Sequence, residues 1–281
     1  MYTGKLGVGV ISWERLYLLA KLVTDLERQT WLENTTFHLF NDGHTCKFTG
    51  SQLINPEKID RAKILWDQAD IPKGESQFRD LNVGVGLHQK NAYDWMCDRY
   101  EYIVMLENDI RVSPYYLRLA RVGFSDVINA NEDISVFSLG YKKDCNEIQG
   151  NLNSWNMGWV HWWDAIFKSD MWRQILPELE EYYSLINDRP YEDRPNKEIK
   201  RLHEQKGVEF KGTSQDYAKG MALKSLGKKR AKTVVNRVFY TGVKGVHSSR
   251  DWYENHDYKD AKPYVFDRDA FISCFERLRG N

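Results

Sequence analysis

Short apolar runs alternate along the first half of the chain with longer segments whose apolar residues recur every three or four positions. The short runs span residues 6–11, 36–40, 102–106 and 134–139, and the longer segments span 16–26, 59–69 and 87–100. The first pattern is typical of buried strands and the second of amphipathic helices. Strands that alternate with helices predict an α/β fold in which helices flank a mostly parallel central sheet.

Beyond residue 140, the chain has a more mixed pattern. We expect a helix over 171–186 that is interrupted near Pro177, a charged stretch over 188–205, a helix over 215–226 and an extended segment over 231–240. Earlier in the chain, Ser113 is expected to cap a helix with Pro114 at its first position. Because no repeat or low-complexity linker separates the halves, residues 1–281 are predicted to form a single Rossmann-like domain. Its ligands should bind at the strand ends between a half of about 1–125 and a half of about 126–281.

The composition narrows the class of protein. With 40 Lys and Arg against 40 Asp and Glu, the formal net charge is zero, which argues against a surface that is basic throughout, as many nucleic-acid-binding proteins have. No apolar run approaches the roughly 18 residues needed to cross a bilayer, and the first residues lack a signal-peptide pattern. A cytoplasmic protein without a transmembrane segment is therefore expected. The four cysteines are spaced neither as a metal site nor as a disulfide frame and are expected to be free thiols: Cys46, Cys97, Cys145 and Cys274.

Two acidic residues follow the most apolar of the predicted strands. Glu107 and Asp109 are two positions apart, so in an extended chain their side chains project to the same side where the strand emerges. Converging carboxylates repel each other unless a cation lies between them. A hard divalent ion with oxygen ligands, and with open positions for phosphates, is the natural occupant. The alternative is that these acids cap the next helix or pair with Arg111.

Two further residues are candidates for the chemistry of the site. Ser214 is a good N-cap, which places Asp216 in the first turn of a helix, where the helix dipole favours an ionised acid. Such a carboxylate is suited to act as a general base towards a hydroxyl group. His247 lies in a glycine-punctuated loop, where an imidazole could bind a metal or meet a phosphate. Both residue types are also common in purely structural roles.

Aromatic and basic residues gather in two later segments. Four tryptophans fall close together, at Trp155, Trp159, Trp162 and Trp163; core packing is the default for each, and stacking on a sugar is expected for one or two. A run of basic residues without acids follows at Lys219, Lys224, Lys228, Lys229, Arg230, Lys232 and Arg237. This run predicts a solvated face or a contact for a polyanionic acceptor.

In their order along the chain, these stretches resemble the GT-A-fold nucleotide-diphospho-sugar transferases, most closely a bacterial group of glycosyltransferase-2-like enzymes. Residues 11–15 (Ile-Ser-Trp-Glu-Arg) resemble that family's Asn-Arg-Pro turn, 42–43 its Asp-Gly strand end and 82–86 its Asn-Leu-Gly loop. Residues 106–109 are similar to Leu-Glu-Asp-Asp, 158–162 to Gly-Trp-Ala-Thr-Trp, 214–217 to Ser-Trp-Asp-Tyr and 236–248 to the closing Asn-Leu-Val to Thr-His-Thr segment. The matches run from about residue 6 to 249.

The resemblance implies a metal-dependent glycosyltransferase that moves a sugar from a nucleotide-diphosphate sugar to an acceptor hydroxyl, with inversion at the anomeric carbon. It implies Asp216 as the catalytic base, and Mn²⁺ or Mg²⁺ held on the donor diphosphate by Asp109, Glu107 and His247. The donor-side residues that it implies are Ser12, Arg15, Asp42, Gly84, Glu107 and Asn108. The acceptor-side residues are Trp159, His161 and Trp162, and the acceptor is expected to be a glycan or lipid-linked glycan, with nucleic acid left open.

Two other functions stay open from the sequence. A nucleotidyltransferase on a similar scaffold would consume a nucleoside triphosphate, but the glycine-rich and basic triphosphate loop expected near its N-terminus is missing from the sequence. A non-catalytic sugar- or polyanion-binding protein could keep the same fold.

Overall fold

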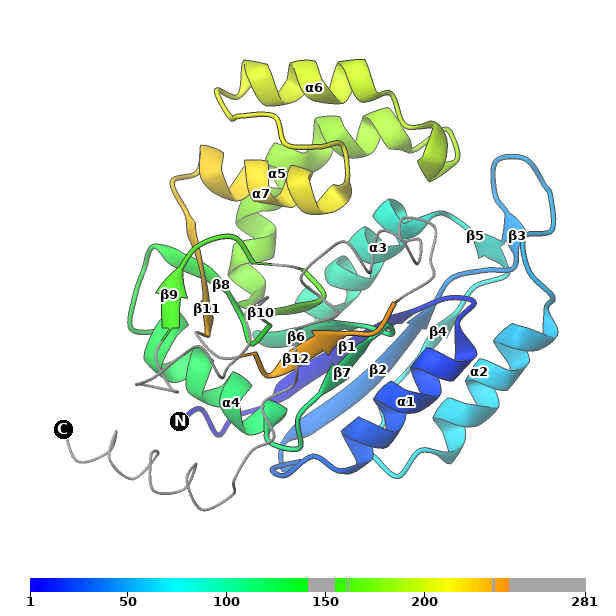
Figure 1. Cartoon of the computed structure of the whole chain (residues 1–281), viewed down its shortest axis with the longest axis vertical. Helices are drawn as coiled ribbons and strands as arrows, with labels where there is room; N and C mark the ends of the chain where they lie inside the picture. Colours follow the sequence, from blue (N-terminus) through cyan, green and yellow to red (C-terminus); the bar gives the residue numbers. More distant parts are fainter. Residues whose placement is uncertain (141–154, 161, 234–235, 243–281) are drawn as a thin grey trace.

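An eight-stranded sheet runs through the middle of the molecule (Figure 1). The computed structural model describes residues 1–140, 155–160, 162–233 and 236–242. In spatial order, the strands are β4 (Gln77–Phe78), β2 (Thr35–Asn41), β1 (Leu6–Ser12), β6 (Tyr102–Glu107), β10 (Asp164–Lys168), β8 (Ile134–Ser138), β11 (Lys229–Thr233) and β9 (Trp155–Met157). Strands β10 and β9 run antiparallel to their neighbours, and the other six share one direction. The prediction of a mostly parallel sheet is confirmed.

Helices cover both faces of this sheet, as the wholly apolar strands predict. On one face lie α1 (Leu16–Glu27), α2 (Glu57–Gln68), α4 (Tyr116–Val122) and the π-helical turn η1 (Gly123–Ile128). On the other lie α3 (Val85–Cys97), α5 (Ser169–Ile186), α6 (Asn196–Gln205) and α7 (Gln215–Ser225), with the short 3-10 helix η3 (Tyr191–Asp193). Alternate residues of β6 serve the two cores: Val104 and Leu106 pack towards α1, and Ile103 and Met105 pack towards α3 and α5.

Two small sheets extend the strand ends. Strand β7 (Ile110–Val112) pairs antiparallel with β12 (Val238–Tyr240), and β3 (Thr45–Cys46) pairs with β5 (Leu81–Asn82). The segment predicted as one extended stretch over 231–240 is therefore divided between two sheets, with β11 in the large sheet and β12 against β7. Through β12, a distant part of the chain reaches the residues that follow β6.

Three predicted helix details are wrong. Helix α5 passes through Pro177 without interruption, because Ile175 and Leu179 on either side are both fully buried in one core, and this packing outweighs the loss of a backbone hydrogen bond. Helix α3 begins at Val85 and ends at Cys97, whereas 87–100 was predicted. Helix α4 begins at Tyr116, so Pro114 is not its first residue.

The start of α4 is displaced because tertiary contacts hold the segment before it. The carbonyl of Ser113 accepts a hydrogen bond from Gln29 Nε2 at 2.7 Å, and its amide donates to the carbonyl of Arg237 at 3.2 Å. Ser113 Oγ makes no capping bond. Ser214 does occupy the N-cap position of α7, but its side chain makes no capping hydrogen bond either.

Two expectations about the chain as a whole are tested by the described residues. None of their helices is long and apolar enough to span a bilayer. Cys46 and Cys97 are buried free thiols, as predicted; Cys145 and Cys274 lie outside the described residues.

Candidate functional site

A cavity of about 860 Å³ lies at the carboxyl ends of β1, β2 and β6. It brings together residues from both halves of the chain, including Ser12, Asp42, Asp109, Trp159 and Asp216. The carboxyl edge of parallel strands is the usual ligand site in open α/β sheets. Most residues predicted to bind or act on a ligand therefore face one space. His161 and His247, also predicted, lie outside the described residues.

The acidic segment forms the floor of the cavity at the turn between β6 and β7. Asn108 lies against the end of β1: its amide donates to the carbonyl of Ile11 at 2.9 Å and its Nδ2 donates to Ser12 Oγ at 3.1 Å. On the other side, Thr241 donates to the backbone carbonyl of Asp109 from its amide at 2.7 Å and from its Oγ1 at 2.9 Å. The turn is thus bound on two sides.

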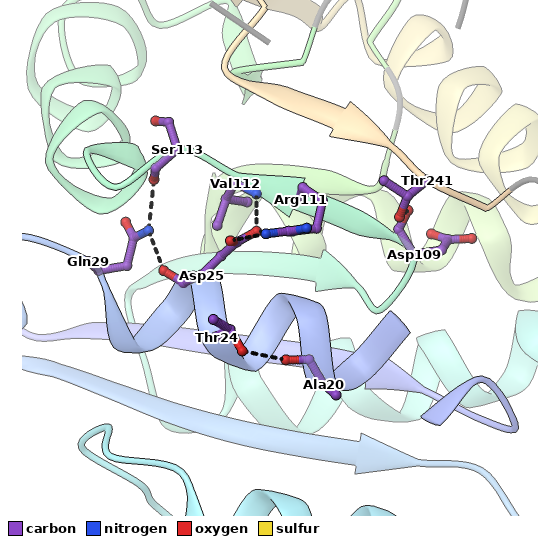
Figure 2. Close-up of polar contacts among 9 residues, drawn as sticks. All are labelled: Ala20, Thr24, Asp25, Gln29, Asp109, Arg111, Val112, Ser113 and Thr241. Carbon is purple, nitrogen blue, oxygen red and sulfur yellow. Dashed lines mark hydrogen bonds and ion pairs between the residues drawn. The ribbon is translucent and has the colours of Figure 1, made fainter. Parts of the chain in front are cut away.

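A clamp from α1 holds β7, the strand that follows this turn. Figure 2 shows the Asp25 carboxylate facing Arg111 and the amide of Val112. The distances are 2.5 Å to Arg111 Nε, 2.6 Å to Arg111 Nη2 and 3.2 Å to Val112 N. Arg111 is therefore engaged by Asp25, and the alternative that it pairs with Glu107 or Asp109 is wrong.

The carboxylate of Asp109 is buried and only partly compensated. Arg15 Nη2 donates to its Oδ2 at 2.8 Å, while Oδ1 is buried and lacks a hydrogen-bond partner in the described part of the chain. Burial raises the pKa of Asp109 above its ordinary value in spite of the Arg15 ion pair. The predicted donor residue and the predicted metal ligand are thus direct neighbours.

Glu107 and Asp216 are connected by two residues that sequence reasoning did not place in the site. Gln89 Nε2 donates to Glu107 Oε1 at 2.7 Å, and Lys219 Nζ donates to Gln89 Oε1 at 2.7 Å. Lys219 Nζ also lies 3.2 Å from Asp216 Oδ1. Burial, followed by the charges of Asp109 and Asp216, raises the pKa of Glu107 to about 8. Burial and the neighbouring acids thus favour the neutral form of Glu107 at neutral pH when no cation is bound.

Asp42, which directly follows β2, forms one end of the cavity. Its Oδ1 accepts hydrogen bonds from the amides of Gly43 at 3.0 Å and Val83 at 3.2 Å. His88 lies beside it, with Nδ1 4.0 Å from Asp42 Oδ1 and Nε2 3.1 Å from the carbonyl of Phe40. Burial lowers the pKa of His88, and a carbonyl can only accept, so the neutral ring carries its proton on Nε2 and presents Nδ1 as an acceptor.

Gly84 forms the entrance to α3 at the same end. Its φ of 80° lies in the region that favours glycine, and a Cβ there would meet Tyr191 Cβ at 3.0 Å. Tyr191, from η3, lines the cavity, and its hydroxyl accepts a hydrogen bond from the amide of Gln215 at 2.9 Å. Tyr191 thereby links the glycine loop to the helix that carries Asp216.

Two aromatic pairs form the wall on the far side. The rings of Trp159 and Tyr217 lie 5.1 Å apart, and those of Trp163 and Tyr240 are stacked at 4.8 Å. All four line the cavity. Trp162 does not: it is 1% exposed and belongs to the core beneath α3 and α5, so its prediction as a residue that touches the acceptor is wrong.

The basic run over 219–237 does not form one solvated face. Lys219 and Arg237 are buried, whereas Lys224 and Lys229 are exposed. The guanidinium of Arg230 lies 4.3 Å from the ring of Trp159, behind the aromatic wall, and burial lowers its pKa to about 10. The run therefore divides between core, wall and surface, because helix α7 and strand β11 turn successive residues in different directions.

Comparisons with known proteins give distant matches. No family model and no curated protein matches the chain. Among solved structures, the fold is similar to residues 1–349 of TarS from S. aureus, with a TM-score of 0.49 and 12% identity over 89% of this chain and 62% of that one. A longer TarS structure gives 0.47 and 12% over 84% and 36%. The glycosyltransferase GlyE of Streptococcus pneumoniae TIGR4 gives 0.37 and 9% over 65% and 40%. The chain thus spans less than two thirds of each, and likeness at this level assigns no activity.

Proposed function

We propose that this chain is a GT-A-like glycosyltransferase that moves a sugar from a nucleotide-diphosphate sugar to an acceptor hydroxyl. The observation that carries the proposal is the composition of the cavity. Asp42 and Gly84 lie at one end, the acidic pair Glu107 and Asp109 lies on the floor, and Asp216 lies on the helix opposite. A group transfer needs a donor and an acceptor bound in one cavity, with a general base beside the acceptor. This cavity offers room for both substrates and a candidate base in Asp216.

The acidic floor fits a divalent cation such as Mn²⁺ or Mg²⁺. Asp109 Oδ1 is buried without a partner among the described residues, Asp216 lies close by, and a bound cation would favour the ionised form of Glu107, whose pKa burial raises to about 8. No group of three His, Cys, Asp or Glu side chains in the described ranges could hold an ion alone. Mg²⁺ is commonly bound by one or two carboxylates together with substrate phosphates, so diphosphate oxygens and water would complete the shell. Arg15 would face the same phosphates.

The chemistry then follows from the positions of the chain's own residues. Asp216 takes the proton of the acceptor hydroxyl as its oxygen attacks the anomeric carbon, and the bond from that carbon to the diphosphate oxygen breaks with its electron pair. When bound at Asp109, a divalent cation would neutralise the charge that develops on the leaving diphosphate. Base and leaving group on opposite sides of the sugar would invert the anomeric carbon.

The aromatic wall supports a sugar acceptor. Tyr217 follows Asp216 directly in the chain, its ring lies 5.1 Å from that of Trp159, and both residues line the cavity. Flat rings of this kind stack on the apolar face of sugars. A glycan or lipid-linked glycan is the acceptor class that we propose. A cytoplasmic location stays a prediction from the sequence.

The test is release of nucleoside diphosphate from a panel of nucleotide sugars with Mn²⁺, with and without glycan acceptors. We expect turnover that EDTA stops and that Asp216→Asn lowers by about 10²–10⁴-fold in kcat. Asp126→Asn is the control, because Asp126 is an exposed acid in η1 that does not line the cavity; this variant should keep wild-type activity. Tight donor binding without turnover of any pair would mean a binding protein, and pyrophosphate release from a nucleoside triphosphate would mean a nucleotidyltransferase. NMR of the product's anomeric proton decides between inversion and retention.

A further inference from the structure

A lysine lies buried directly behind the wall of the cavity. Lys219, one turn after Asp216 on α7, is 1% exposed. Its Nζ lies 4.5 Å from the ring centroid of Trp162 and 5.1 Å from that of Tyr93. Burying an ammonium group costs several kcal/mol unless other groups compensate its charge. An apolar side chain would pack in this aromatic surrounding at no such cost, so the charge itself calls for an explanation.

The partners of Lys219 form an ordered chain of contacts. Nζ lies 3.2 Å from Asp216 Oδ1 and donates to Gln89 Oε1 at 2.7 Å, and Gln89 Nε2 donates to Glu107 Oε1 at 2.7 Å. An ammonium group can only donate, so its partner on Gln89 must be the amide oxygen. The Gln89 amide must therefore direct its oxygen to Lys219 and its NH₂ group to Glu107, so its orientation follows from its neighbours.

Only the two ends of this chain reach the cavity. Glu107 and Asp216 line it, whereas Lys219 and Gln89 do not. The contacts connect the end of β6 with the first turn of α7 through α3, and the Lys219 to Gln89 bond joins residues 130 positions apart. The two carboxylates come from different halves of the chain, and this chain of contacts fixes one relative to the other.

We infer that Lys219 and Gln89 are positioning residues: from behind the cavity wall, they hold the carboxylates of Asp216 and Glu107 in a fixed relation. The inference rests on the proposed function, in which Asp216 acts on the acceptor and Glu107 lies on the donor side. Neither positioning residue touches a substrate. Their effect is to keep the base aligned with the donor, and misplacement of reacting groups by about 1 Å can lower a rate by about 10²-fold.

The experiment compares steady-state kinetics of four variants with the wild type, with Mn²⁺ and the best nucleotide sugar of the panel. Lys219→Met keeps the unbranched stem, which can stay among the aromatic rings; we expect kcat to fall by about 10–100-fold and KM for the donor to change less than twofold. Lys219→Arg keeps the charge and should recover at least part of kcat. Gln89→Leu leaves the Lys219 and Asp216 pair intact and frees Glu107, so KM for the donor should rise. Lys224→Met is the matched control, since it makes the same change at an exposed position of the same helix.

The outcomes separate the inference from the proposed function. If the wild type turns over a donor but Lys219→Met keeps its kcat within twofold, the positioning role is wrong and the transferase proposal stands. If the wild type turns over no nucleotide sugar, both fail. A purely structural role would lower kcat and Tm together in Lys219→Met and Lys219→Arg alike, which would also overturn the inference. If Lys219→Met does not fold, Gln89→Leu decides, and wild-type kinetics in that variant would refute the role.

Discussion

Replacing Asp25 with alanine removes the three contacts by which α1 clamps the strand after the acidic turn (Figure 2). Two of them are charged hydrogen bonds to Arg111, and the third is to the amide of Val112. Because β7 continues directly from Asp109, the loss of the clamp should affect both the stability of the fold and the position of the carboxylate that we assign to the donor side.

The size of the effect follows from the exposure of the partners. The Arg111 side chain is 26% exposed, so after the change it can turn towards solvent and loses little beyond the net value of the pair. The buried amide of Val112 loses the Asp25 carboxylate as its acceptor, and a buried donor left without a partner costs about 1–3 kcal/mol. Contacts that share one carboxylate are not additive. A loss of about 3 kcal/mol in the free energy of unfolding is therefore expected.

Urea denaturation followed by circular dichroism measures this loss. Asp188→Ala is the control, because Asp188 forms a similar two-bond pair with Arg189 at 2.7 and 3.2 Å on the exposed surface; it should leave the midpoint unchanged. In the folded Asp25→Ala protein, Mn²⁺-dependent binding of a nucleoside diphosphate should also weaken. A loss below about 1 kcal/mol, or equal losses in both variants, would refute the clamp.

Three further predictions concern the cavity itself. Burial is the chief cause that raises the pKa of Glu107 to about 8. Between about pH 5 and pH 8, the folded protein therefore holds a proton on Glu107 that the unfolded chain releases. The free energy of unfolding of the metal-free protein should fall as pH rises through this range. Glu107→Gln should remove this slope in urea titrations with EDTA and gain about 2 kcal/mol at pH 8, after discounting for its partial exposure; an unchanged slope would contradict it. Trp159→Ala should raise the acceptor KM at least tenfold and leave the donor KM unchanged, whereas Trp31→Ala at an exposed position should change neither. Gly84→Ala should lower the free energy of unfolding by about 1–2 kcal/mol because its φ is 80° and Tyr191 crowds the new Cβ; a variant as stable as wild type would show that the loop relaxes.

The sheet could be predicted because its strands are buried on both faces and therefore consist of uninterrupted apolar runs. Strand β6, from Tyr102 to Glu107, is the clearest case. The errors lie where tertiary contacts outweigh local preference. Gln29 and Arg237 hold Ser113 outside α4, and no local pattern around residue 113 indicates partners about 84 and 124 positions away. The sequence predicts a break at Pro177, but the buried residues Ile175 and Leu179 keep the helix continuous.

The candidate site could be predicted in part for a similar physical reason. The carboxyl ends of parallel strands meet at one edge, so Ser12, Asp42 and Glu107 had to lie near one another once the strands were assigned. Gln89 and Lys219 were missed because both lie inside helices. Their burial and their shared hydrogen bond depend on how α3 and α7 both pack against α5. One signal was present: Lys219 follows Asp216 by three residues, the spacing at which helical side chains meet.

The most direct test of the account is isothermal titration of nucleoside diphosphates into the wild type and Asp109→Asn, each with Mn²⁺ and with EDTA. If the acidic floor of the cavity holds a divalent cation on a donor diphosphate, one nucleoside diphosphate should bind the wild type at least tenfold more tightly with Mn²⁺. That gain should be lost in Asp109→Asn, while the variant keeps the wild-type Tm within a few degrees. Binding of equal affinity with EDTA, or an Mn²⁺ effect that survives in Asp109→Asn, would contradict the assignment of Asp109.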